Sequence, residues 1–263
     1  MAEPTPPRPG VLSRHAAAWG GLALLLFWFA LARSGLVGRT LLADPLEVLA
    51  VLGRELDPHA SGRVLPHALG TLGRALSGWA WGMGLGVAIG LLAGRGPSLE
   101  RASAPTLELA RAIPPIMVFP LFLVYFNYAD AAYVGTIAFG CAPVVALTLA
   151  RARRRLGGTS FELLEVFGAS RSARGFAVAM ELSPSVLLAS RLALSLSLVI
   201  AIVTEMVFAP RSGLALGAYA KDAEMSFDTP AFYAAMLLVG GLGFALNAGL
   251  AWLERRLGGT RVR

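Results

Sequence analysis

One short polar segment between two apolar runs carries the residues whose types and spacing best fit a binding function. Glu162 lies in the first turn of a predicted short helix, where the positive end of the helix dipole favours a carboxylate. Leu163, Leu164 and Phe167 give that helix an apolar face, and Gly168 can adopt the left-handed turn that ends it. The pattern predicts an exposed amphipathic helix. It leaves two interpretations open, a helix that binds a groove on a partner protein and a helix that lies on lipid.

No residues in the sequence fit a catalytic or metal site. Lys221 is the only lysine, and no G-x-x-x-x-G-K-[ST] motif surrounds it, so the phosphate-binding loop of an ATPase is absent. No zinc-ligand motif, no hydrolase motif and no carboxylate pair with acid and base spacing occurs. Cys141 is the only cysteine. We therefore expect no enzyme activity, no bound metal and no cofactor on this chain.

The composition indicates a membrane protein. Hydrophobic residues make up 56% of the chain and charged residues only 15%, against about 25% charged in an average globular domain. The net charge of +7 does not indicate nucleic-acid binding, because the arginines gather at the ends of apolar runs and not in a basic stripe. We predict an all-α membrane protein.

The apolar runs predict about six transmembrane helices. They occupy residues 16–32, 76–93, 112–126, 131–150, 186–208 and 231–253. A cleaved signal peptide is the alternative for the first run, but no small-residue cleavage site follows it. Residues 1–15 are expected to be a disordered cytoplasmic N-terminus, and residues 16–263 a single transmembrane domain. The basic residues favour both chain termini in the cytoplasm.

Two segments before the second predicted span are expected to lie outside the membrane. Asp44 is a predicted N-cap, Pro45 fits the first helical position, and the helix that they start reaches about Leu56. The segment 65–76 contains Arg74 and is expected to approach the membrane from outside. Together the two segments predict an amphipathic region that lies outside the membrane and precedes the second span.

The second predicted span carries glycine at every fourth position, at Gly78, Gly82, Gly86, Gly90 and Gly94. Residues four apart lie on nearly the same face of a helix, so another helix can approach this glycine stripe closely. The stripe fits either static tight packing or a contact that moves during transport.

Four polar or helix-breaking residues are candidates for a solute pathway or gate. Pro114 and Pro115 remove backbone donors in the third span, which predicts a kink beside a cavity or a neighbouring helix. Glu205 lies within the fifth span, where a carboxylate is costly unless it pairs with a base or faces the pathway. Arg191 is the only cation predicted inside a span, and it either extends to the interface or pairs with Glu181.

The order of several short motifs resembles the permease subunits of ABC importers. The motifs are Glu162, Gly168 and Pro184 in the polar segment, DPLEVL at Asp44, ARAIPP at Ala110, SRLAL at Ser190, TEMV at Thr204, SGLALGAYA at Ser212 and the ending WLERRL. They are most similar to the branch that handles nitrate, sulfonates and taurine. The resemblance implies the type I ABC importer permease fold and a cytoplasmic coupling loop over about 156–184. The ATPase-coupling residues that it implies are Glu162, Leu163, Leu164, Glu165, Phe167, Gly168, Ala169 and Ser170.

The resemblance also implies the partners. ATPase subunits would bind ATP and Mg²⁺, a second permease copy would complete the path as a homodimer, and an extracytoplasmic binding protein would deliver the solute. The chain would lie in a bacterial inner membrane, in contact with lipid and without nucleic acid. An ATP-independent secondary transporter or channel is the alternative, and a non-transporting membrane scaffold is a second one. The first alternative gives the polar loop no role, and the second explains the glycine stripe but not the kinked spans.

Overall fold

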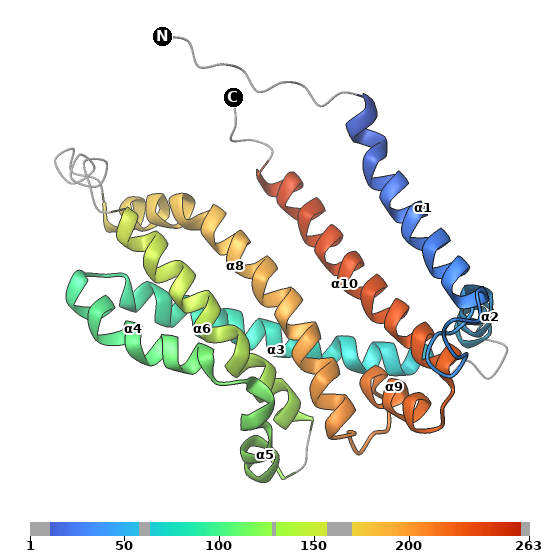
Figure 1. The fold of residues 1–263 in the computed structure, drawn as a ribbon. Coiled ribbons are helices and arrows are strands. Elements are labelled where there is room, and N and C mark those ends of the chain that lie inside the picture. The colour runs from blue at the N-terminus through green and yellow to red at the C-terminus, as the bar shows by residue number, and fades with distance from the viewer. Residues whose placement is uncertain (1–10, 58–63, 128–129, 157–169, 259–263) are drawn as a thin grey trace. The chain divides into compact units, whose positions relative to one another are not determined.

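The computed structural model describes residues 11–57, 64–127, 130–156 and 170–258, and every regular element within these ranges is helical (Figure 1). The chain divides into two compact units. Unit 1 comprises residues 1–62 and 223–234, and unit 2 comprises residues 63–222 and 235–263.

Unit 1 contains α1 (Val11–Arg33) and α2 (Pro45–Leu56). The Asp44 carboxylate accepts a hydrogen bond from the backbone of Leu46 at 2.9 Å, so the predicted N-cap and helix start are confirmed. This backbone hydrogen bond, together with one from Arg33, holds the pKa of Asp44 below its ordinary value. The carboxylate therefore stays charged at neutral pH and keeps the cap in place.

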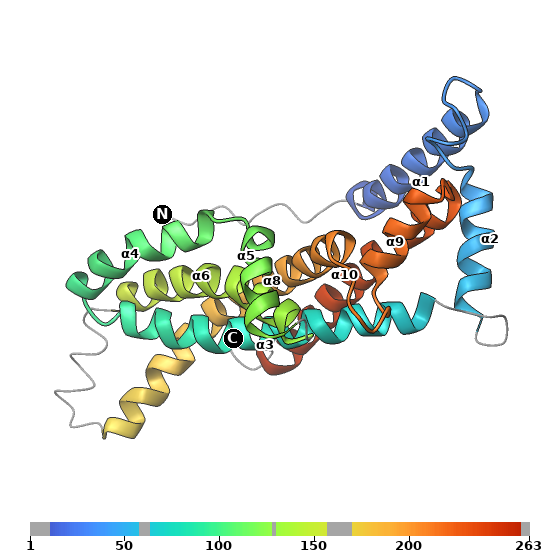
Figure 2. The same cartoon turned by 90° about the horizontal axis from the view of Figure 1, so that it is seen from below.

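In unit 2, α3 (Val64–Ala93) packs along α6 (Ala131–Arg155), as both views show (Figures 1 and 2). The glycine stripe forms this contact. A Cβ atom on Gly78, Gly82 or Gly86 would lie 2.5 Å from a side-chain atom of α6. The predicted packing role of Gly78, Gly82, Gly86 and Gly90 therefore corresponds to an observed contact within one chain. Residues 65–76, predicted to lie outside the membrane, belong to the same unbroken helix as the predicted span, with neither proline nor positive-φ glycine after its first turn. Their position outside the membrane stays a prediction.

The third predicted span, over residues 112–126, has a corner at its start. Helix α4 (Pro97–Ala112) and helix α5 (Pro115–Tyr125) meet at an angle of 90°. Ile113 and Pro114 between them are extended, with ψ of 121° and 123°. A residue that precedes proline is disfavoured in the helical region, so the sequence Ile113-Pro114-Pro115 ends one helix and starts another. At the predicted kink, one helix thus ends and a second begins at 90° to it.

The remaining helices are α8 (Arg171–Val207), α9 (Leu216–Met225) and α10 (Thr229–Gly258). Helix α8 begins well before the predicted fifth span and continues through Pro184. The second half of the predicted coupling loop, from residue 171 to 184, is therefore helical.

Four helices within the described ranges are long and apolar enough to cross a membrane, and the bent α4 and α5 pair makes a fifth if it counts as one span. The segment Trp19–Arg33 is apolar but shorter. The prediction of an all-α membrane protein is confirmed.

Candidate functional site

Glu205 of α8 is a fully buried carboxylate in the interior of unit 2. Its Oε2 accepts a hydrogen bond from the Thr71 hydroxyl at 2.7 Å and one from the Gly217 backbone at 3.1 Å. Its Oε1 accepts from Nε of Arg74 at 2.8 Å. Burial of a charge is tolerated only with such partners. The sequence leaves two roles open for Glu205, a gating or structural ion pair and a residue of the pathway. The structure shows an ion pair with Arg74.

Arg74 of α3 is the partner that the sequence did not reveal. It is 5% exposed, and besides Glu205 it donates to the carbonyl oxygen of Leu214 at 2.6 Å. Its third nitrogen lies 3.6 Å from the Asp130 carboxylate, whose side chain is 60% exposed. Its guanidinium also lies over the Tyr133 ring, 5.5 Å from the centroid. Because α3 is itself long and apolar enough to cross a membrane, Arg74 is, besides Arg191, a second cation on a candidate span.

Hydrogen bonds beside this ion pair also join the connection between α8 and α9 to α3. The Leu216 backbone donates to the Thr71 hydroxyl at 2.8 Å, and the Ala215 backbone donates to Nδ1 of His67 at 3.1 Å. Gly217 permits the approach, since a Cβ there would lie 2.5 Å from the carbonyl oxygen of Ile202. Helices α3 and α8 and the start of α9 are therefore joined by one buried polar cluster. We call His67, Thr71, Arg74, Glu205 and residues 214–217 the Arg74 cluster.

Arg191 lies elsewhere on α8 and pairs with Glu254 of α10, and not with Glu181 as predicted. Its Nε atom is buried and has no hydrogen-bond partner among the described residues. One helical turn further along α8, the Ser195 hydroxyl and the Asn247 amide of α10 bond to each other, with Nδ2 at 3.1 Å from the hydroxyl oxygen. The structure therefore does not bring Arg191 and Glu205 together. They belong to separate polar contacts on one helix.

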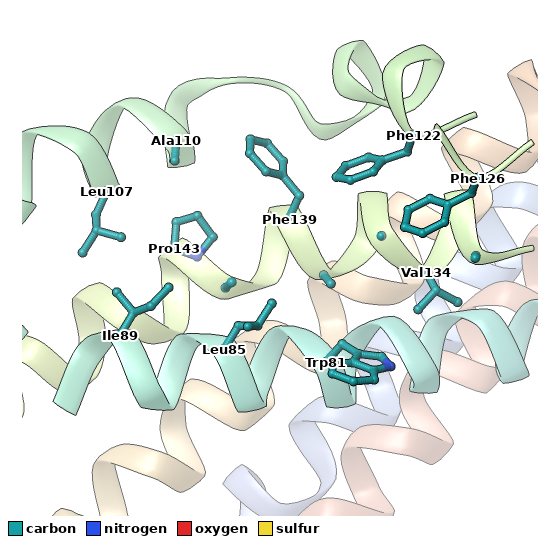
Figure 3. A pocket seen from close by; sticks show the side chains of 14 residues that line it. Trp81, Leu85, Ile89, Leu107, Ala110, Phe122, Phe126, Val134, Phe139 and Pro143 are labelled. Carbon is teal, nitrogen blue, oxygen red and sulfur yellow. The ribbon is translucent and has the colours of Figure 1, made fainter. Parts of the chain in front are cut away.

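Pro114 and Pro115 lie at the corner between α4 and α5. Pro115 packs on Gly140 of α6, where a Cβ atom would lie 2.7 Å from the proline ring. Beside this corner lies a groove of about 590 Å³ between α3, α4, α5 and α6. Figure 3 shows aromatic and aliphatic side chains from all four helices that face into it. We call it the α3–α6 groove.

Of the predicted ATPase-coupling residues, 162–165 and 167–169 lie outside the described residues. Ser170 is described, and its hydroxyl accepts a hydrogen bond from the Ala173 backbone at 3.2 Å as the N-cap of α8. The segment that precedes it connects the end of α6 at Arg155 to the start of α8 at Arg171.

The end of α6 that leads into this segment is basic and is tied to α4. Arg154 pairs with Glu100 at 2.5 Å, and Arg151 pairs with Glu108 at 2.8 Å. Arg111 also binds Glu108, at 2.6 Å. The Arg154–Glu100 and Arg151–Glu108 pairs hold the polar helix α4 against α6, so α4 belongs to the basic end of the bundle.

The described residues thus form a helical bundle with a 90° corner between α4 and α5, a buried ion pair and a basic end of α6. Residues 86–259 match the family described as binding-protein-dependent transport system inner membrane component. The chain belongs to this family, and its resemblance to ABC importer permeases is confirmed.

Individual relatives match over nearly the whole chain. The chain is 27% identical over 235 residues to the putative aliphatic sulfonates transport permease protein SsuC of Bacillus subtilis, which covers 89% of this chain and 83% of that protein. It is 24% identical to the taurine transport system permease protein TauC of Escherichia coli, over 90% of this chain and 87% of that protein. It is 30% identical to the riboflavin transport system permease protein RibX of Chloroflexus aurantiacus, over 95% and 94%.

Proposed function

We propose that this chain is the permease subunit of an ABC importer, which forms the path of a small organic or anionic solute together with a second copy of itself. The observation that carries the proposal is the family match, because residues 86–259 include both the cornered helix pair and the predicted coupling segment. The relatives named for sulfonates and taurine support a small anionic solute. The relative named for riboflavin supports a wider class of organic solutes.

In this proposal ATP hydrolysis belongs to a partner ATPase, with its ATP and Mg²⁺, and not to this chain. The partner docks on the helix predicted over Glu162 to Gly168, and its ATP-driven closure moves α6 and α8, the two helices that flank the segment. An energy source is needed because solute binding alone can shift an equilibrium but cannot drive a repeated cycle. A binding protein supplies the solute from outside, and the chain lies in a bacterial inner membrane with both termini in the cytoplasm.

The contacts of α8 support a helix that is fixed at one end and coupled to the partner ATPase at the other. The Arg74 cluster joins α8 to α3 at one end, and Ser170 at the other end follows the coupling segment directly. A movement applied at Ser170 is therefore transmitted along a helix that Glu205 anchors. Rocking of this helix is expected to alternate the accessible side of the path.

A Gly168→Trp variant tests the docking role. We expect the tagged wild-type chain, purified from its own membranes in mild detergent, to bring with it an ATPase that contains a P-loop. The variant is expected to lose this ATPase and solute uptake, because a bulky residue replaces the glycine that ends the docking helix.

Gly53→Trp provides the matched control. It is also a glycine-to-tryptophan change, and a side chain on Gly53 of α2 meets nothing within 4 Å. The control should retain the ATPase. If the wild-type chain is well folded but comes out without an ATPase, the secondary-transporter alternative replaces the importer.

A further inference from the structure

The α3–α6 groove is apolar on every side. Its lining residues are Trp81, Leu85, Ile89, Leu107, Ala110, Phe122, Phe126, Ala131, Val134, Gly135, Ala138, Phe139, Ala142 and Pro143. Trp81 and Leu85 are 65% and 49% exposed, so the groove opens at the side of the helix pair (Figure 3). An anionic solute would lose its hydration here without gaining a hydrogen bond, which is costly. The groove therefore fits an apolar occupant.

The length of the groove matches one leaflet of a bilayer. Its lining residues on α6 extend from Ala131 to Pro143. At a rise of about 1.5 Å per residue this stretch covers roughly 18 Å. One leaflet contributes about half of the roughly 30 Å hydrocarbon core. A single acyl chain can therefore lie along the groove.

A surplus of positive charge lies beside one end of the groove. Leu107 and Ala110 of α4 line it, and of their neighbours in sequence Glu108 pairs with Arg151 of α6 and Arg111 pairs with Glu108. Glu108 binds both Arg111 and Arg151, whose side chains are 56% and 62% exposed. One carboxylate cannot neutralise two guanidinium groups. The exposed N–H groups that remain suit a phosphate, which arginine binds in bidentate fashion.

We propose that the α3–α6 groove binds one anionic phospholipid from the surrounding bilayer, with an acyl chain between α3 and α5 and the phosphate at Arg111 and Arg151. A second copy of this chain is a weaker fit, because an apolar helix in the groove would not compensate the positive charge that Arg111 and Arg151 carry in excess of Glu108. The site goes beyond the transport function, and it couples the position of α4 to the lipid composition.

The test is native mass spectrometry of the delipidated full-length chain, titrated with phosphatidylglycerol or with phosphatidylcholine. We expect one phosphatidylglycerol to remain bound at low lipid concentration and phosphatidylcholine to bind more weakly. The double variant Arg111→Gln with Arg151→Gln should weaken phosphatidylglycerol binding about thirtyfold, since each basic residue near a membrane surface contributes about 1 kcal/mol. Ala142→Phe should reduce binding of both lipids by filling the groove.

Arg255→Gln is the matched control, because Arg255 is an exposed arginine near the end of α10 and far in sequence from the groove. It should bind phosphatidylglycerol as the wild type does. Equal binding of both lipids with no effect of the double variant would overturn the proposal, since it would indicate unspecific lipid. A change from dimer to monomer in Ala142→Phe, with the lipid count unchanged, would also overturn it and assign the groove to a second copy. If Ala142→Phe does not fold, the arginine variants alone decide.

Discussion

Replacement of Arg74 with methionine is expected to destabilise the protein strongly. Glu205 would stay fully buried without its cation, and the carbonyl oxygen of Leu214 would lose its donor. Removal of one partner from a buried ion pair costs about 3–5 kcal/mol. For a chain of this size we expect the unfolding temperature to fall on the order of 10 °C. Thermal unfolding of the purified chain in mild detergent measures this, and solute uptake should be lost in parallel.

Two further variants distinguish the effect of breaking the buried ion pair from the effect of removing any positive charge. Arg33→Met removes the cation of the Arg33–Asp44 pair, whose arginine side chain is 53% exposed. An exposed pair contributes less than about 1 kcal/mol, so the unfolding temperature should change little. The double variant Arg74→Met with Glu205→Leu leaves no unpaired charge in the interior and should recover part of the stability that Arg74→Met loses. If Arg33→Met and Arg74→Met lowered the unfolding temperature equally, the Arg74 cluster would not be the buried anchor described here.

Glu205 and Arg74 show how far the sequence could predict this site. A carboxylate inside an apolar run is costly, so the sequence predicted that Glu205 either pairs with a base or faces the pathway. It could not predict Arg74, because the partner lies 131 positions away and belongs to a helix whose start was placed outside the membrane. Only the folded chain brings the two residues together. A search for a cation in the neighbouring spans, with their bounds extended by two turns, would have found it.

The same limit applies to the helices themselves. Helical periodicity predicted the face on which the glycines of α3 lie, but not that α6 packs against it, because a periodic pattern defines a face and not its partner. Proline spacing predicted a kink near Pro114, whereas the 90° corner depends on the extended conformation of two consecutive residues. The coupling helix predicted over Glu162 to Gly168 lies outside the described residues and stays a prediction.

Gly86→Leu is expected to prevent the normal packing of α3 against α6. A Cβ atom on Gly86 would lie 2.5 Å from Cβ of Val145 and 2.7 Å from the carbonyl oxygen of Ala142. The second of these atoms belongs to the backbone, so the clash cannot be relieved by a change of rotamer. The two helices would have to separate, and the contacts of Gly82 and Gly90 along the same face would be lost with them. We expect little monodisperse protein on size-exclusion chromatography and no uptake.

Gly84 provides the matched control on the same helix. It lies off the stripe, and a Cβ atom there meets nothing within 4 Å. Gly84→Leu should therefore purify as the wild type does and could gain up to about 1 kcal/mol from its better helix propensity. Equal behaviour of the two variants would mean that α3 and α6 are not in close contact along the stripe. The expected difference favours static packing over a sliding contact, since backbones this close leave no room for one helix to move past side chains of the other. In transport, α3 and α6 would then move as one body, and the movement would occur at the corner between α4 and α5 and along α8.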